Sequence, residues 1–476
     1  MKLTRRSLLQ GAAALPAAVP AMSQQTNGPM NLIHIGVDTW ATHFLGCYGN
    51  QTIHTPNVDA LAAKSVVFED AYPEVLPTLP ARRCIYTGRR IFPSDMIPQF
   101  DDQVKIRGWH PLFTEDVTIS ETLRASGYTT AFVSDIYHQF KPDKNFHRGF
   151  DSWRYIRGQE SDRLETGPRS RIKLADYSHA SQPVNPKAMS GVMQYLLNRQ
   201  DWKTSGDYLA AQVFREATQW LEKNAAENSP FYLHIESFSP HEYWDPPDEF
   251  YRMYMKSNYR GPRLIMPPNA TTNMSSVEVE HAKALYSGLV SFVDDRIGSL
   301  LNAVERMGLM KNTLICFVAD HGTMMGEQDQ LHKGEQRIRT QVTHVPMMIY
   351  HPREQWAGKR VKGFVQHPDL MPTLLDTLGL AIPKRVTGES LRSLTPPKRG
   401  TIVTGWGEHG AIRTSEWLYI GRWNPGAKFE QLYNVRKDPL ELKNIAAENP
   451  TVAEEFRGQL NRHVEGGWQI TRGTFA

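Results

Sequence analysis

Two short, largely apolar runs that each end on an aspartate constrain the fold most. Residues 31–37 (Asn-Leu-Ile-His-Ile-Gly-Val) stop at Asp38, and residues 312–319 (Asn-Thr-Leu-Ile-Cys-Phe-Val-Ala) stop at Asp320. Such short runs, rich in β-branched residues, predict strands that are buried in a parallel sheet. Sites in open α/β sheets form outside the carboxyl ends of the strands, so both aspartates are expected at a site edge.

The second run continues with Asp320-His321-Gly322. A carboxylate and an imidazole that are adjacent at a strand end can both reach one divalent ion if the backbone turns there. Gly322 permits that turn. For Asp38 taken alone, a helix cap remains the simpler interpretation.

The stretch from Thr78 to Arg89 (Thr-Leu-Pro-Ala-Arg-Arg-Cys-Ile-Tyr-Thr-Gly-Arg) predicts a loop that leads into a helix. Pro80 suits an early helical position, and Gly88 is a plausible end. Thr78 is therefore expected at a helix N-terminus, where the dipole favours negative charge, with Arg82 one turn further on. This combination suits attack on a tetrahedral oxyanion ester, although an N-capping threonine with a surface arginine is the alternative.

Length and charge exclude several classes of protein. A chain of 476 residues has room for one large α/β domain and a smaller one. The net charge is +4, and Lys2, Arg5 and Arg6 supply three of these charges, which leaves +1 for the rest. A nearly neutral chain gives no reason to expect nucleic acid as a partner. The three cysteines are too few for a disulfide framework or a zinc cluster and are expected to be packing residues: Cys47, Cys84 and Cys316.

The N-terminus has the pattern of an export signal. Residues 2–21 have a basic start, Arg-Arg-Ser-Leu-Leu, followed by an alanine-rich apolar run. This pattern predicts a signal peptide of the twin-arginine type over residues 1–25, read by the twin-arginine export machinery, with cleavage after or near Ala21. No cysteine follows the run and no later segment is apolar enough to span a bilayer, so no stable membrane anchor is expected. The exported protein would be periplasmic or extracellular; a disordered basic tail is the alternative.

The remaining chain alternates between helical and strand patterns. Residues 161–198 are polar and irregular and resemble an inserted excursion that walls the substrate site. The other expected elements are strands at 128–133, 231–236, 345–350 and 432–435, and helices beginning at 119 and 367 or spanning 208–224 and about 277–307.

The spacing Thr-x-Pro-x-Arg, followed by four residues and Thr-Gly-Arg, resembles the signature of the sulfatase family in the alkaline phosphatase superfamily. Further stretches are similar to this family: Gly46–Asn50, Thr55–Ala62, Phe146–Asp151, Asp320–Gly322 and Asp438–Ala446. The resemblance implies an α/β/α sandwich around a large, mostly parallel sheet. It also implies a catalytic domain over residues 30–380 and a smaller C-terminal α+β subdomain over residues 381–476.

This chain departs from the family pattern at the first signature position. Thr78 stands where the family has the Cys or Ser that becomes formylglycine, and oxidised threonine would be a ketone, so no formylglycine is expected. Ala81 replaces a serine of the signature, and Thr39 replaces a second aspartate after the first strand. Ile136 stands where arylsulfatases have a cationic lysine, next to Asp135.

The resemblance also implies roles for individual residues. His241 falls at the position of the leaving-group histidine, Lys333 at that of the active-site lysine, and His138 and Arg82 are kept. Outside this context, the histidines would be ordinary loop residues and Lys333 a solvated charge. The expected metal ligands are Asp38, Thr78, Asp320 and His321, which resemble the set of phosphonate monoester hydrolases and of Thr-dependent transferases in the superfamily. One imidazole among oxygen ligands favours one Mn²⁺ or Zn²⁺ ion, with Ca²⁺ possible.

Three functions follow from these residues. The leading hypothesis is a metal-dependent hydrolase of phosphodiesters or phosphonate monoesters with Thr78 as nucleophile, acting on a small-molecule or glycan ester. The alternatives are a sulfuric ester hydrolase, similar to arylsulfatases or glycan sulfatases, and a non-catalytic protein that binds a glycan.

Overall fold

The computed structural model of the chain describes residues 28–94, 106–141, 143–185, 187–226, 229–423 and 428–471. The segment expected to be an export signal lies outside these residues. Within them, no helix combines the length and the apolar character that crossing a membrane requires.

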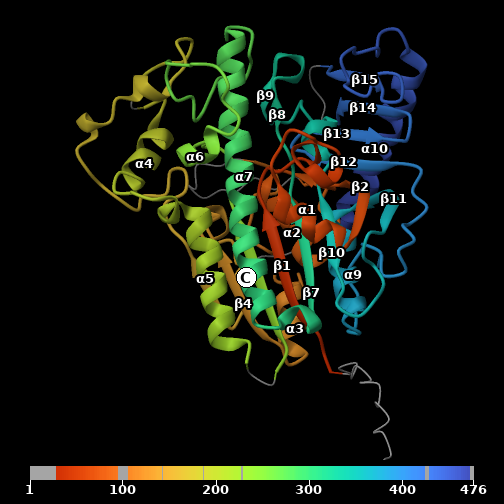
Figure 1. The fold of residues 1–476 in the computed structure, drawn as a ribbon. Coiled ribbons are helices and arrows are strands. Elements are labelled where there is room, and N and C mark those ends of the chain that lie inside the picture. The colour runs from red at the N-terminus through yellow and green to blue at the C-terminus, as the bar shows by residue number, and fades with distance from the viewer. Residues whose placement is uncertain are drawn as a thin grey trace, which may run out of the picture.

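An eight-stranded sheet forms the centre of the molecule (Figure 1). Only β10 runs antiparallel to its neighbours; every other described pair in this sheet is parallel. The order across the sheet is β11 (Arg360–Gln366), β2 (Val66–Tyr72), β10 (Met347–Tyr350), β7 (Thr313–Ala319), β1 (Asn31–Val37), β6 (Phe231–Ser237), β4 (Thr129–Ser134) and β5 (Ser152–Tyr155).

Helices cover this sheet as an α/β/α sandwich. One group packs together around the long helix α7 (Ser276–Arg306): α1 (Pro56–Ala63), α5 (Leu209–Asn224) and α6 (Asp248–Tyr251). A second group consists of α2 (Thr78–Thr87), α3 (Ile119–Ala125) and α9 (Leu370–Thr377). The predicted helix over 277–307 is confirmed to within a residue at each end, and the fold class is as expected.

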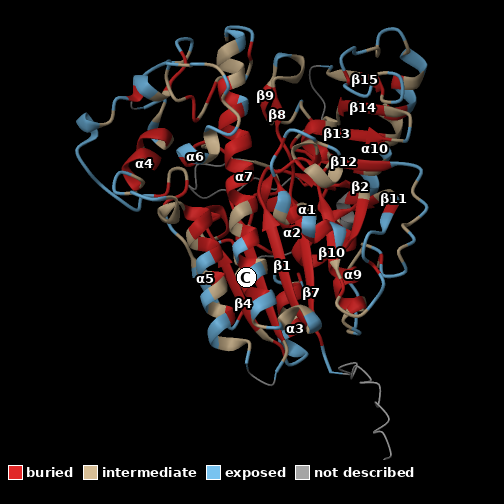
Figure 2. Ribbon diagram, in the orientation of Figure 1, coloured by how far each residue is buried: buried red, intermediate tan, exposed pale blue. Residues whose placement is uncertain are grey.

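The central strands bring the expected residues to one edge. All seven residues of β1, of β6 and of β7 are buried, as Figure 2 shows in red for β1 and β7. Val37 lies opposite both Ser237 and Ala319 in the parallel ladders. The residues that follow, Asp38 and Asp320, therefore leave the sheet side by side, which confirms the position predicted for them.

A second sheet belongs to the C-terminal part of the chain. Its order is β15 (Glu430–Asn434), β14 (Trp417–Arg422), β13 (His409–Arg413), β12 (Ile402–Trp406) and β3 (Val75–Leu76). Because β3 comes from the N-terminal half, residues 381–476 do not form this sheet alone. The closing strand at 432–435 is confirmed. The helix α10 (Pro450–Thr471) was not expected; its apolar residues pack on the sheet: Ala453, Phe456, Leu460 and Val464.

The excursion over 161–198 is only partly irregular. It ends in the helix α4 (Ser190–Asn198), which packs with Leu174 and Ile265 in a small separate core. The apolar residues Val192, Met193 and Leu196 follow helical spacing within an otherwise polar stretch, so a short window centred on them predicts this helix. The remaining short elements are β8 (Met324–Met325), β9 (Leu331–His332) and α8 (Thr340–Thr343).

Candidate active site

Asp38, Asp320 and His321 form a compact, fully buried cluster at the edge of the main sheet. One ligand atom from each lies within 4.8 Å of the others. Among the described residues, His321 Nε2 and Asp38 Oδ2 are buried without a hydrogen-bond partner, although Asp38 Oδ2 lies 3.1 Å from Arg82 Nη1 in an ion pair. His321 Nδ1 donates to the Gly322 carbonyl oxygen at 3.0 Å, since that oxygen can only accept. The lone pair is therefore on Nε2, the arrangement usual for an imidazole that binds a metal. The cluster is a potential site for a divalent ion.

Burial and the neighbouring charges shift the pKa of every residue in the cluster. Burial lowers the pKa of His321 to about 3, so the imidazole is neutral and can act as a ligand near neutral pH. Burial, followed by the charge of Asp320, holds the pKa of Asp38 well above its usual range. Although burial opposes it, His321 and Arg82 together hold the pKa of Asp320 below its usual range. A bound cation would relieve the repulsion between the two carboxylates.

Thr78 is the first residue of α2, and its carbonyl oxygen accepts from Arg82 Nη1, the nitrogen that also contacts both aspartates of the cluster. The helix ends at Gly88, whose φ of 62° is left-handed, so both predicted ends of the helix are confirmed. A Cβ at Gly88 would also lie 2.9 Å from Val386. The Thr78 hydroxyl makes no hydrogen bond to any residue that the structure describes, and Thr78 is 3% exposed. This hydroxyl is therefore free for a ligand.

The guanidinium of Arg82 contacts both aspartates of the cluster. Its Nη1 lies 2.5 Å from Asp320 Oδ2, 3.1 Å from Asp38 Oδ2 and 3.2 Å from the Thr78 carbonyl oxygen. Its Nε donates to Glu236 Oε2 at 2.9 Å. Burial opposes protonation, but the three carboxylates outweigh it and raise the pKa of Arg82 above its usual range. Within the described residues Nη2 makes no such contact.

His241 and Lys333 form a second group. Lys333 Nζ lies 3.0 Å from His241 Nε2 and donates to Glu242 Oε2 at 2.8 Å. His241 Nδ1 donates to the Glu242 carbonyl oxygen at 2.7 Å, which leaves Nε2 to accept from Lys333. Burial and Lys333 lower the pKa of His241, whereas Glu242 and Asp38 raise that of Lys333 against the effect of burial. The shared proton therefore rests on Lys333.

His138 joins the second group through a carboxylate. Its Nε2 lies 3.1 Å from Glu160 Oε2, and the other oxygen of Glu160 lies 3.7 Å from His241 Nδ1. Glu160 stands where the excursion begins, with a φ of 44°. The structure thus brings together the residues expected at the site.

The loop after β4 carries the two residues at the position of the arylsulfatase lysine, Asp135 and Ile136. Ile136 is fully buried. Asp135 accepts from the Phe238 N–H at 2.7 Å and from Gln159 Nε2 at 2.7 Å, and burial raises its pKa to about 6. Asp135 therefore anchors the loop that carries His241, and neither residue supplies a cation.

Four residues of the site were not predicted. Thr39, with a φ of 62°, donates from its hydroxyl to Asp38 Oδ1 at 2.7 Å and from its N–H to Asp320 Oδ1 at 3.0 Å. Glu242 follows His241 directly, so its position next to the site could have been predicted from the sequence. The other two, Glu160 and Glu236, act only through contacts between distant segments, which no local pattern reveals.

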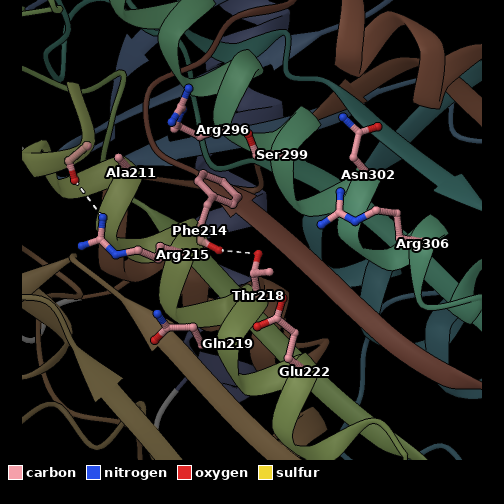
Figure 3. A pocket seen from close by; sticks show the side chains of 11 residues that line it. Ala211, Phe214, Arg215, Thr218, Gln219, Glu222, Arg296, Ser299, Asn302 and Arg306 are labelled. Atoms are coloured by element: carbon pink, nitrogen blue, oxygen red, sulfur yellow. Dashed lines mark hydrogen bonds between the residues drawn. The ribbon is translucent and has the colours of Figure 1, made fainter. Parts of the chain in front are cut away.

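Of two surface hollows, only the smaller has a residue of the site in its lining. Lys333 lines one of about 380 Å³ together with polar residues, among them Asn269, Gln336 and Arg337. A larger groove of about 520 Å³ lies between α5 and α7, with Arg215 and Arg306 on its walls (Figure 3). None of the site residues lines that groove, so its size does not make it the catalytic centre.

Comparison with known families agrees with this geometry. The Sulfatase family model matches residues 30–380, and the model of the N-sulphoglucosamine sulphohydrolase C-terminal region matches residues 335–466.

Individual relatives are similar over nearly the whole chain. An arylsulfatase of Clostridium perfringens is 26% identical, over 90% of this chain and 92% of its own. An ulvan-active sulfatase of Formosa agariphila is 26% identical, over 91% of this chain and 81% of its own. The fold is similar to that of the phosphonate monoester hydrolase of Agrobacterium radiobacter, with a TM-score of 0.68 and 22% identity, over 90% of this chain and 94% of that one. The chain belongs to the sulfatase family of the alkaline phosphatase superfamily and is a hydrolase that acts on ester bonds.

Proposed function

We propose that this protein hydrolyses phosphodiesters or phosphonate monoesters, with Thr78 as the nucleophile. One observation carries the proposal: in the buried Asp38–Asp320–His321 cluster no described residue hydrogen-bonds His321 Nε2, and Arg82 Nη1 links both aspartates to the Thr78 carbonyl oxygen. The Thr78 hydroxyl stands at a helix N-terminus, where negative charge on a tetrahedral ester is favoured.

The proposed metal ligands are Asp38, Thr78, Asp320 and His321. One imidazole among oxygen ligands favours Mn²⁺ or Zn²⁺ over Ca²⁺. A divalent ion held here would polarise the ester oxygens and lower the pKa of the Thr78 hydroxyl, whose proton leaves to solvent.

The proposed reaction uses the chain's own groups in two displacements. Thr78 Oγ1 forms a bond to phosphorus as the bond to the leaving oxygen breaks, and that oxygen takes a proton from the His241–Lys333 pair. Water then attacks phosphorus and returns a proton to the pair, and the bond to Thr78 breaks. Arg82 Nη2 and Lys333 face the charge on the non-bridging oxygens.

His138 has a supporting role in this proposal. Its hydrogen bond to Glu160 places it next to His241, where it helps to hold the leaving-group side of the site.

Sulfuric ester hydrolysis is the second candidate, because the curated relatives named above are sulfatases. Threonine serves this chemistry poorly. A sulfate ester of Thr78 lacks the second hydroxyl through which hydrated formylglycine expels sulfate, so turnover would need another displacement. Ile136 also supplies no cation for the sulfate oxygens.

The decisive experiment compares rates on aryl phosphate monoester, diester, phosphonate and sulfate with metal-replete protein. We expect the diester and the phosphonate to react fastest. A higher rate on the sulfate would overturn the proposal. Absence of turnover together with absence of a stoichiometric ion would favour a non-catalytic glycan-binding protein.

His241→Ala tests the assignment of the leaving-group acid. We expect rates on esters with poor leaving groups to fall by about 10²–10⁴-fold, and rates on nitrophenyl esters to fall much less, because only the former need a proton in the transition state. The measurement is kcat/KM for a matched pair of alkyl and nitrophenyl diesters. Equal losses for both substrates would remove His241 from this role.

A further inference from the structure

Glu236 is a buried carboxylate that the proposed reaction does not use. It lies on β6 and is 3% exposed. Its Oε2 accepts from Arg82 Nε at 2.9 Å, and its Oε1 lies 3.1 Å from His234 Nε2 and accepts from the Tyr86 hydroxyl at 3.4 Å. Both oxygens are thus occupied by protein groups, and Glu236 acts on the site only through Arg82.

The neighbouring strand makes room for this carboxylate. Gly36 of β1 lies directly opposite Glu236 in the parallel ladder. A Cβ on Gly36 would lie 3.0 Å from Glu236 Oε2 and 3.1 Å from its carboxyl carbon. A glycine inside a buried strand usually marks such a close approach. Two strands therefore determine the position of the Glu236 carboxylate: β6 carries the side chain, and Gly36 of β1 leaves the space that it occupies.

Arg82 is surrounded by more carboxyl groups than it can neutralise when all of them are ionised. Asp38, Asp320 and Glu236 contribute three buried carboxylates, and Arg82 contributes one guanidinium. When all are ionised, two negative charges remain, which one divalent ion would neutralise. Lys333 makes its ion pair with the carboxylate of Glu242.

Glu236 also fixes the orientation of the Arg82 guanidinium. With Nε held by Glu236, a single nitrogen, Nη1, serves both Asp38 and Asp320. Without that anchor the guanidinium fork can turn and grip one aspartate with two nitrogens. It would then occupy carboxylate oxygens that the ion needs.

We propose that Glu236 is a positioning residue that sets the affinity of the site for its divalent ion by holding Arg82 in place. This inference rests on the metal site of the proposed function. Partners of this kind commonly change metal affinity by 10–100-fold when they are altered.

The test is a Mn²⁺ titration of the chelator-treated full-length protein, without substrate. We expect Glu236→Gln to weaken the Kd for Mn²⁺ by at least 10-fold and Glu236→Asp, which keeps the charge, to weaken it less. Glu441→Gln is the matched control, since Glu441 is also fully buried and lies 3.1 Å from the guanidinium of Arg413, in the second sheet. Its Kd should equal that of the wild type even if its Tm falls.

Gly36→Ala gives a second measurement that changes no charge. The added methyl group displaces the Glu236 carboxylate, so Mn²⁺ binding should again weaken while that of the Glu441 variant does not. If Glu236→Gln fails to fold, Glu236→Asp and Gly36→Ala decide the question. Wild-type affinity in the folded Glu236 and Gly36 variants would overturn the inference alone, whereas a wild type that binds no Mn²⁺ or Zn²⁺ would overturn the proposed function as well.

Discussion

Asp320→Ala should abolish binding of the divalent ion and, with it, turnover of every ester. Asp320 contributes a carboxylate to the cluster, receives two backbone N–H donors that fix its orientation, and is 2% exposed. Loss of a direct ligand should exceed the 10–100-fold effect common for indirect partners, so we expect the Kd for Mn²⁺ to rise by more than about 100-fold. Metal analysis after dialysis and a calorimetric titration measure this effect.

The fold is expected to survive the substitution. Arg82 keeps Asp38 and Glu236 as partners, so no buried guanidinium is left without a carboxylate. Asp294→Asn provides a control: Asp294 is buried in α7 and accepts from the Val58 N–H at 2.8 Å, away from the cluster. That variant should bind the ion normally. A stoichiometric ion of unchanged affinity in Asp320→Ala would exclude the cluster as the metal site.

Thr78→Ala should lower kcat on a phosphodiester by about 10⁴-fold or more, because loss of a nucleophile removes the covalent route altogether. Thr78→Ser keeps a hydroxyl at the start of α2 and should retain measurable turnover. Single-turnover assays on metal-replete proteins, with bound ion determined in each, separate loss of the nucleophile from loss of the ion. Equal rates for the alanine and wild-type proteins would require another nucleophile.

Thr78→Cys decides between phosphoryl and sulfuryl chemistry. The variant reads Cys-Leu-Pro-Ala-Arg, which meets the minimal pattern for conversion to formylglycine. Once mass spectrometry confirms the aldehyde, we expect only a modest gain in aryl sulfate turnover, since Ile136 supplies no cation to the sulfate oxygens. If the converted protein hydrolyses aryl sulfate faster than the wild type hydrolyses any phosphate or phosphonate ester, the phosphoryl assignment is wrong.

Much of the fold could be predicted because its signals are local. The strand at 31–37 and the helix from Thr78 to Gly88 have the bounds that apolar runs, Pro80 and the left-handed glycine indicate. Helix α10 was missed because its sequence is mostly polar and few of its residues reach the core. The helix is stabilised by packing on the sheet, a contribution that the helix propensities of its residues do not include.

The candidate site could be predicted only in part. The apolar runs that end at Asp38 and Asp320 predicted that both carboxylates lie at one edge of the sheet, because parallel strands deliver their following residues to the same edge. The contacts of Arg82 could not be inferred, since the partner on its Nε is Glu236, 154 residues away. An arginine one turn after a nucleophile is expected to face substrate; here carboxylates bind two of its three nitrogens.

The short strand β3 has a consequence for how the protein is made. Val75 and Leu76 pair with Gly405 and Trp406 of β12, and Thr78 follows two residues after Leu76. The ribosome must therefore add some 330 residues after β3 before its partner strand exists. Contacts between residues this far apart in the sequence form late in folding. The residue proposed as nucleophile thus acquires its final support only after β12 has been synthesised, so that a nascent chain with an otherwise formed central sheet would still be inactive.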